Sequence, residues 1–232
     1  MLHRQKADDL RGIIQGERAR LAATGNYHFD EKAHKYHMYG QVVPSVTKVI
    51  SSLPPDLLMN SAFIRKTQIG TDTHTMAEYY VDEHMGWGEV PEPDFNPVAL
   101  MDMGPYVAGV RKFLEREKYT FVSTELRVHS ELYKTAGTLD ILAINSKGHL
   151  VLMDWKTVTK LSPTVGLQLA AYAKFYWEMF GKLTKVKVKH REAIWLTGDG
   201  DYKIVPYKNP DDESVFMCKL ISHQWDVLNK IK

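Results

Sequence analysis

The sequence predicts an α/β protein with a mixed central sheet flanked by helices and a helical N-terminal extension. Before residue 118 the apolar residues recur mainly with helical spacing, and from Thr120 their spacing becomes that of strands. From residue 97 onward the expected order is α-β-β-β-α-β-β-α. Strands and helices alternate in this way in layered α/β folds.

Length and composition describe one ordinary globular domain. Of the 232 residues 44% are hydrophobic and 25% charged, which excludes disorder, collagen-like repeats and a coiled coil. Cys218 is the single cysteine, so neither an intrachain disulfide nor a multi-cysteine zinc site can form. Because no repeat or Gly/Ser linker occurs, we expect residues 1–232 to form a single domain. Its expected parts are residues 1–60 (first helix and small strands), 61–118 (a helical wall), 119–208 (the sheet core) and 209–232 (a C-terminal helix).

The first half of the chain is expected to be mainly helical, with short strands between its first two helices. Glycine and proline mark the ends of these elements, and Ser45 supplies an oxygen that can cap a short helix. Pro54 and Pro55 separate this short helix from the next. The expected helices cover residues 5–23, 45–50, 62–84 and 97–118, the last interrupted or restarted at Gly104-Pro105, and the expected strands cover residues 27–30, 35–39 and 41–43.

The second half is expected to build the sheet. A helix begins near Pro163 and ends at Gly181, and a last helix covers residues 211–230. Lysines alternate on the first strand of the final hairpin, which suits protection of an exposed sheet edge better than phosphate binding; they are Lys185, Lys187 and Lys189. The expected strands cover residues 121–129, 137–144, 149–157, 185–197 and 201–207.

The net charge of +2 hides an asymmetry along the chain. Residues 61–105 contain two basic and eight acidic residues, whereas residues 141–190 contain eight lysines and two acidic residues. This division suits a metal-carboxylate site beside a phosphate-binding surface, and it suits ordinary solvated faces as well. Charge alone does not decide between them.

Neither a membrane span nor a targeting segment is expected. No stretch reaches the roughly 18 apolar residues that a span requires, and the N-terminus lacks the apolar core of a secretory signal. Acidic residues in the first helix argue against a mitochondrial presequence. We therefore expect a cytoplasmic protein without a membrane partner.

Two aspartates flank the turn between the second and third strands of the sheet. The turn Ser146-Lys147-Gly148 has the length and the glycine of a three-residue hairpin loop, and this register sets Asp140 opposite Asp154. Directly opposed residues share a face of the sheet, and so do residues two apart, which brings Lys156 to the same spot. A turn of two or four residues would reverse the parity and leave only a structural Asp–Lys pair.

Opposed carboxylates in a sheet repel each other, so their presence calls for a positive charge between them. Mg²⁺ meets this need, because it binds one or two carboxylates together with water and substrate phosphates. Mn²⁺ is the alternative. The pattern therefore predicts a divalent-metal site with Lys156 beside it.

Four sequence elements, in this order, resemble the RecB-like branch of the PD-(D/E)XK nuclease superfamily. They are Gly70-Thr71-Asp72-Thr73-His74 with Glu78, Gly137-Thr138-Leu139-Asp140, Asp154-Trp155-Lys156-Thr157, and Gln168 with Tyr172. Within this branch the chain is most similar to the mitochondrial genome maintenance exonuclease family and its phage-encoded relatives, which also share a segment like Pro44-Ser45-Val46-Thr47. The likeness covers roughly residues 27–230 and implies a restriction-endonuclease-like αβββαβ core.

The resemblance also implies roles for individual residues. Asp140 and Asp154 would bind the metal together with the backbone carbonyl of Trp155 and with His74, and Lys156 would position or deprotonate the attacking water. Packing alone would also account for a histidine at position 74. The residues implied as substrate-binding or supporting are Gln168, Tyr172, Thr157, Glu125, Glu78, Ser45 and Thr47.

For several of these residues an ordinary packing or surface role stays open as the alternative. Glu78 shares a helix face with His74 and could orient it or reach the metal through water, but an exposed glutamate there would be ordinary. Glu125, on the strand before the two aspartates, is a candidate for the same carboxylate cluster, with a surface glutamate as the alternative. Gln168 and Tyr172 are equally compatible with helix packing. Aromatic residues of the N-terminal strands, among them Phe29, are candidates for stacking against bases.

The expected function is that of a metal-dependent DNA exonuclease which prefers single strands or free ends, in a phage or bacterial setting. A single-strand-binding or annealing protein is its implied partner. The alternatives within enzymes are a double-strand exonuclease of a phage recombination module and an endonuclease. A catalytically silent DNA-binding scaffold subunit is the alternative of another class. A zinc hydrolase is disfavoured because His74 and Glu78 do not match the H-E-x-x-H spacing.

Overall fold

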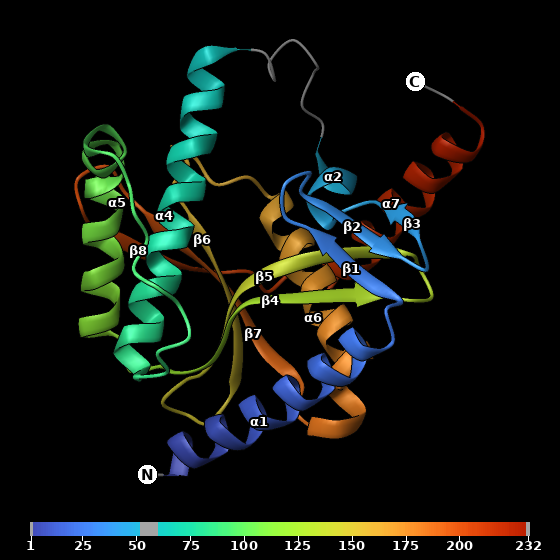
Figure 1. Ribbon diagram of the computed structural model, residues 1–232, viewed down its shortest axis with the longest axis horizontal. Coiled ribbons are helices and arrows are strands. Elements are labelled where there is room, and N and C mark those ends of the chain that lie inside the picture. The colour runs from blue at the N-terminus through green and yellow to red at the C-terminus, as the bar shows by residue number, and fades with distance from the viewer. Residues whose placement is uncertain (1, 52–59, 231–232) are drawn as a thin grey trace.

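The computed structural model describes residues 2–51 and 60–230 as an α/β arrangement of two sheets and surrounding helices (Figure 1). Pro54 and Pro55 lie outside the described residues. In chain order the elements are α1 (Leu2–Ala23), β1 (Tyr27–Asp30), β2 (Lys35–Met38), β3 (Gln41–Val43), α2 (Val46–Ile50), α4 (Ser61–Met85), α5 (Pro97–Arg116), β4 (Thr120–Ser130), β5 (Thr135–Ile144), β6 (Leu150–Lys156), α6 (Thr164–Thr184), β7 (Val188–Leu196), β8 (Tyr202–Pro206) and α7 (Asp212–Leu228).

The larger sheet has the strand order β4-β5-β6-β7-β8, antiparallel throughout except for the parallel pair β6–β7. Apolar residues of α4 and α5 pack with one set of strand residues, whereas α1, α2, α6 and α7 pack with the alternate set. The sheet therefore lies between two helical layers (Figure 1). The prediction of a mixed sheet flanked by helices, in the order α-β-β-β-α-β-β-α from residue 97, is confirmed.

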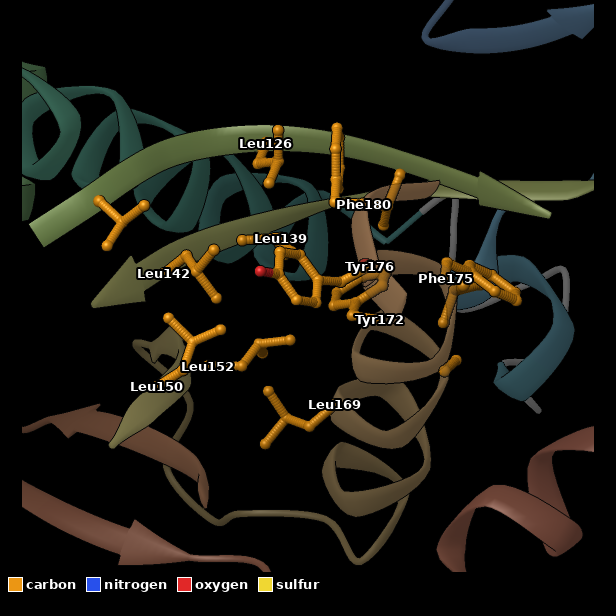
Figure 2. Close-up of a cluster of buried hydrophobic side chains, with 14 of the residues drawn as sticks. Leu126, Leu139, Leu142, Leu150, Leu152, Leu169, Tyr172, Phe175, Tyr176 and Phe180 are labelled. Atoms are coloured by element: carbon orange, nitrogen blue, oxygen red, sulfur yellow. The ribbon is translucent and has the colours of Figure 1, made fainter. Parts of the chain in front are cut away.

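The core between the sheet and α6 is made of large apolar side chains (Figure 2). Burial of each such side chain contributes roughly 1.5–3 kcal/mol to folding. Leu139 and Leu142 both reach this cluster although they are three residues apart, a spacing that points to opposite faces in a regular strand. Ile141 belongs to the cluster on the other face of the sheet, so the regular alternation of side chains along β5 is interrupted between Leu139 and Ile141.

The smaller sheet, β1-β2-β3, is attached to the outer end of the β4–β5 hairpin (Figure 1). The backbone N–H of Ala136 donates to the carbonyl of Pro44 over 3.2 Å, and the Thr135 hydroxyl donates to the same carbonyl over 2.9 Å. Ala136 also joins the small core cluster with Tyr36 and Val43. These contacts hold the N-terminal strands over one end of the main sheet.

Two predicted helix interruptions are wrong. Pro105 lies inside α5, which runs on without a break. Proline leaves the carbonyl of Met101 without its helical partner, but Met101 is exposed and its carbonyl can bond water. Burial of Val110 and Phe113 against the sheet holds the rest of the helix in place. Gly181 does not end α6, because the helix continues to Thr184. A side chain at position 181 would meet the Trp177 ring at 2.4 Å, so this glycine serves close packing.

The interpretation of the lysines as protectors of a sheet edge is wrong for two of the three. Only Lys189 lies in β7, which begins at Val188, and β7 pairs with β6 on one side and β8 on the other. The β8 ladder begins only at Glu192, so the stretch of β7 that holds Lys189 pairs with β6 alone. The interpretation is therefore wrong for Lys185 and Lys187, which lie outside the strand, and stays a prediction for Lys189. Lys185 ends α6 in the left-handed conformation and Lys187 lies between the two elements.

The register predicted for the central hairpin is confirmed. Gly148 has the positive φ of 75° that the turn requires, and the backbone N–H of Asn145 donates to the carbonyl of His149 over 3.0 Å. The β5–β6 pairs follow as expected down to Ile141 with Met153.

Within the described part of the chain, no helix combines the length and the apolar character that crossing a membrane requires.

Candidate functional site

A cleft of about 840 Å³ opens between α1, the small sheet, α4 and the strands β4 to β6. It collects most of the residues expected at the site: Thr47, His74, Glu78, Glu125, Asp140, Asp154, Lys156, Gln168 and Tyr172. Ser45, Trp155 and Thr157 do not line it.

Asp140 and Asp154 both face the cleft, but they do not form a ladder pair. The β5–β6 ladder ends one position earlier, at Ile141 and Met153. The carboxylate of Asp140 instead accepts the backbone N–H of Trp155 over 2.8 Å. The expectation of directly opposed aspartates therefore needs correction: the strands separate here, which relieves part of the repulsion between the two charges.

Three side chains from separate elements offer ligand atoms within 4.8 Å of one another: His74 of α4, Glu125 of β4 and Asp140 of β5. Nδ1 of His74 lies 3.3 Å from Oδ2 of Asp140. Glu125 has a left-handed φ of 44°, which costs a non-glycine residue free energy and is found most often at functional sites. Glu125 and Asp140 form no ladder pair themselves, but they lie opposite each other between the pairs Thr124–Ile141 and Leu126–Leu139.

The carboxyl groups of this cluster are shifted toward their neutral forms. Burial, and then the charge of Asp154, raises the pKa of Asp140 to about 6, although His74 and Lys156 act in the opposite direction. Burial, with Asp140 and Glu78 nearby, raises the pKa of Glu125 well above its usual range. The protein therefore does not compensate these charges with its own cations, which is the situation in which a bound cation stabilises a site.

Asp154 has different neighbours. Its Oδ1 accepts a hydrogen bond of 3.0 Å from Nε2 of Gln168, and its Oδ2 forms an ion pair with the ammonium of Lys156. Gln168 also donates to the Tyr172 hydroxyl over 3.3 Å. Asp154, Gln168 and Tyr172 are all buried, so this chain of bonds holds Asp154 and Lys156 in fixed positions.

Lys156 is cationic in this arrangement. Burial acts to lower the pKa of its ammonium, but the carboxylates of Asp154 and Asp140 outweigh burial and raise that pKa. A lysine that keeps its proton offers a positive charge and three hydrogen-bond donors.

One face of α4 supplies the remaining polar lining. His74 and Glu78 are four residues apart, and Gly70 lies one turn earlier. A side chain at position 70 would meet Oγ1 of Thr157 at 3.3 Å, so Gly70 and Thr157 set how closely α4 approaches the end of β6. Burial, followed by the charge of Asp82, raises the pKa of Glu78.

The segment around Ser45 caps a short helix and contributes one residue to the lining of the cleft. Its Oγ caps α2 by accepting the backbone N–H of Lys48 over 3.1 Å and lies 3.1 Å from the Thr47 hydroxyl. Thr47 lines the cleft and Ser45 does not, and the supporting role of Ser45 stays a prediction. The backbone N–H of Trp155 is engaged by Asp140, and the metal-binding role of its carbonyl stays a prediction.

The sequence interpretation missed the arginines of the cleft, which are Arg11 and Arg18 of α1 and Arg127 of β4. A signal for two of them existed. Residues 11, 15 and 18 share one face of a helix, so a polar stripe on the first helix was readable. Nothing local in the sequence indicated that this stripe faces the carboxylates.

Comparison with known proteins identifies no family. No protein-family model matches the chain, and no curated protein is found to be similar to it. Among solved structures it is similar to one described as "Crystal structure of SSO0001", at a TM-score of 0.34 and 15% sequence identity, over 70% of this chain and 75% of the other. At this TM-score the likeness supports no conclusion about fold or function.

Proposed function

We propose that this chain is a divalent-metal-dependent nuclease of the RecB-like PD-(D/E)XK type, with a restriction-endonuclease-like core, which hydrolyses phosphodiester bonds in DNA. The observation that carries the proposal is the approach of His74, Glu125 and Asp140 to within 4.8 Å, in a cleft that also holds Lys156. A purely structural Asp154–Lys156 pair would require neither the histidine nor two further carboxylates beside it.

The donor set fits a hard divalent cation. Carboxylate oxygens are the ligands that Mg²⁺ and Mn²⁺ prefer, and one imidazole is compatible with Mn²⁺ in particular. The raised pKa values of Glu125 and Asp140 reflect an acidic cluster whose charge the protein does not neutralise. A bound ion of this kind would supply Lewis acidity at a phosphoryl oxygen.

The side chains beside the cluster then have defined tasks. Lys156 keeps its proton and places a positive charge where negative charge develops on the phosphoryl group. Asp154 orients Lys156, and Gln168 orients Asp154 through the 3.0 Å hydrogen bond. Preorganisation of this kind requires no rearrangement when the substrate reacts.

The dimensions of the cleft favour a single strand over a duplex. The volume of the cleft, about 840 Å³, is in the range of small-molecule pockets and is large enough for a few nucleotides. The walls come from α1, the small sheet and α4, so the carboxylates lie inside the cleft. This supports the preference for single strands or free ends over the double-strand alternative.

Digestion of end-labelled single- and double-stranded DNA with Mg²⁺ or Mn²⁺ tests the proposal. We expect the wild-type protein to degrade single strands, and Lys156→Ala and Asp140→Asn to lower the rate by about 10²- to 10³-fold. Lys160→Ala is the matched control, because Lys160 is exposed and lies outside the cleft. Circular dichroism of each variant separates lost chemistry from lost folding.

The outcomes distinguish the competing functions. Cleavage of circular single strands would identify an endonuclease. If no nucleic acid is degraded with either metal while Asp140→Asn still binds DNA like the wild type, the scaffold function is correct and the proposed nuclease is not.

A further inference from the structure

The cleft contains a second charged group, made of three arginines. Arg11 donates to Oε2 of Glu89 over 2.6 Å, and its guanidinium lies 3.5 Å above the Trp87 ring. Arg127 is ion-paired with Glu31. These contacts engage Arg11 and Arg127 with groups of the protein itself.

Arg18 differs from the other two. It lines the cleft, yet it has no hydrogen-bond or ion-pair partner among residues 2–51 and 60–230. Its position is not accidental, because Arg11, Gln15 and Arg18 lie on one face of α1 and all three line the cleft. The helix therefore presents to the cleft a guanidinium that has no hydrogen-bond or ion-pair partner in the described part of the chain.

The carboxylates near Arg18 do not balance its positive charge. The Arg18 residue is exposed to solvent on the cleft side of α1, and its partial desolvation, followed by the like charges of Arg127 and Arg11, lowers the pKa of its guanidinium. Glu89 and Glu78 act in the opposite direction but do not cancel this effect. Planar guanidinium groups bind phosphate in a bidentate manner, and a phosphate here would relieve the repulsion.

We propose that Arg18, with Arg127 beside it, binds a second phosphate of the substrate strand, at a nucleotide other than the one that is cut. This inference rests on the proposed nuclease function and extends it. The cluster of His74, Glu125 and Asp140 acts on one phosphodiester, whereas Arg18 holds another phosphate of the same strand. The substrate is accordingly an oligonucleotide with at least two phosphates.

Two substrates separate the role of Arg18 from that of the carboxylate cluster. Bis(p-nitrophenyl) phosphate contains a single phosphodiester, so its hydrolysis depends only on the cluster of His74, Glu125 and Asp140. A single-stranded oligonucleotide has further phosphates, one of which reaches Arg18. For Arg18→Ala we expect the KM for the oligonucleotide to rise about 10- to 100-fold, the loss of one charged hydrogen-bonding contact. Turnover of bis(p-nitrophenyl) phosphate stays at the wild-type level.

Binding without cleavage gives an independent readout. Fluorescence anisotropy of a labelled oligonucleotide in EDTA, at several salt concentrations, reports the number of phosphates contacted. For Arg18→Ala the slope of log K against log salt should fall by about 0.7, the value for one phosphate of a single strand. Arg18→Lys keeps the charge and should restore most of this slope.

Arg20→Ala is the matched control, because Arg20 lies on the same helix, pairs with Glu17 and does not line the cleft. Its KM and salt slope should equal those of the wild type. An Arg18→Ala variant with the wild-type KM and salt slope overturns the phosphate site and leaves the nuclease function intact. A wild-type protein that hydrolyses neither substrate overturns the nuclease function, and the salt slope in EDTA still decides whether Arg18 contacts a phosphate.

Discussion

The helices α4 and α6 each present a pair of polar residues, four positions apart, to the same cleft, but the two pairs are bonded differently. On α6, Gln168 and Tyr172 are buried and bonded to each other, and Gln168 holds Asp154. On α4, His74 contacts Asp140, whereas Glu78 has no hydrogen-bond or ion-pair partner in the described part of the chain. The α6 wall is completed by the protein's own groups, and the α4 wall carries charge that the protein leaves uncompensated.

This difference assigns separate tasks to the two walls. A buried polar network whose members bond one another makes the surrounding core rigid, so changes on the α6 side should appear as lost stability. Removing one side chain from a cluster of uncompensated charges costs the fold little stability, so changes on the α4 side should appear as lost ligand affinity.

The largest expected effect tests the close packing on the α6 side. In Gly137→Ala the new methyl group would lie 2.5 Å from the Tyr172 ring, which is fully surrounded by the core. We expect a loss of about 3 kcal/mol in the free energy of unfolding, at the upper end for an overpacked core, measured by urea denaturation.

The control for this variant is Gly16→Ala in α1, where a methyl group would meet nothing within 4 Å and no proline follows. This change should increase stability by about 0.5–1 kcal/mol, since alanine is the better helix former. Equal stability of the two alanine variants would mean that the α6 wall is not rigid.

The next effect concerns the pH dependence of the metal-free protein. The folded-state pKa of Asp140, about 6, is higher than its ordinary value of 3.8, so the folded protein binds this proton more tightly than the unfolded chain does. Protonated Asp140 therefore contributes roughly 3 kcal/mol to the free energy of unfolding below about pH 4, and this contribution is lost as the pH rises to about 6.

Thermal unfolding across this pH range, with and without Mg²⁺, measures this loss. The increase in Tm on adding Mg²⁺ should grow from pH 4 to pH 6 and level off above. Asp140→Asn serves as the reference, because other carboxylates also titrate in this range and only the difference between the two proteins belongs to Asp140. A stabilisation by Mg²⁺ that does not depend on pH would contradict the assignment.

The smallest effect compares the two walls directly. We expect His74→Ala to weaken Mn²⁺ binding by about 10- to 100-fold, with little change in the unfolding midpoint of the metal-free protein. Gln168→Leu should do the opposite: it leaves Oδ1 of Asp154 without its buried donor, which costs about 1–3 kcal/mol of stability.

Isothermal titration with Mn²⁺ and urea denaturation, carried out on both proteins, give the two measurements. If His74→Ala destabilises the metal-free fold as much as Gln168→Leu does, the histidine is a packing residue and the α4 wall is structural.

Much of the fold could be predicted because its signals are local. The register of the central hairpin follows from the length of one turn and the glycine at position 148, and both were readable. The errors arose where a local signal had another cause. Gly181 is a packing glycine under Trp177, and Pro105 is tolerated because burial of Phe113 and Val110 outweighs one lost hydrogen bond.

The site was harder to predict than the fold. Asp140, Asp154 and Lys156 could be placed together from strand parity alone. Glu125 joins the cluster through a left-handed backbone distortion that no residue pattern signals, and Asp154 is drawn toward Lys156 and Gln168.

By itself the sequence determined the order of the helices and strands, the register of the central hairpin and the polar residues available for a site, because periodicity and turn chemistry act between near neighbours. Only the tertiary structure decided that His74, Glu125 and Asp140 share one position, and that α1 brings Arg18 to the same cleft. These residues lie far apart in the chain, and their approach depends on how all the helices pack against the sheet.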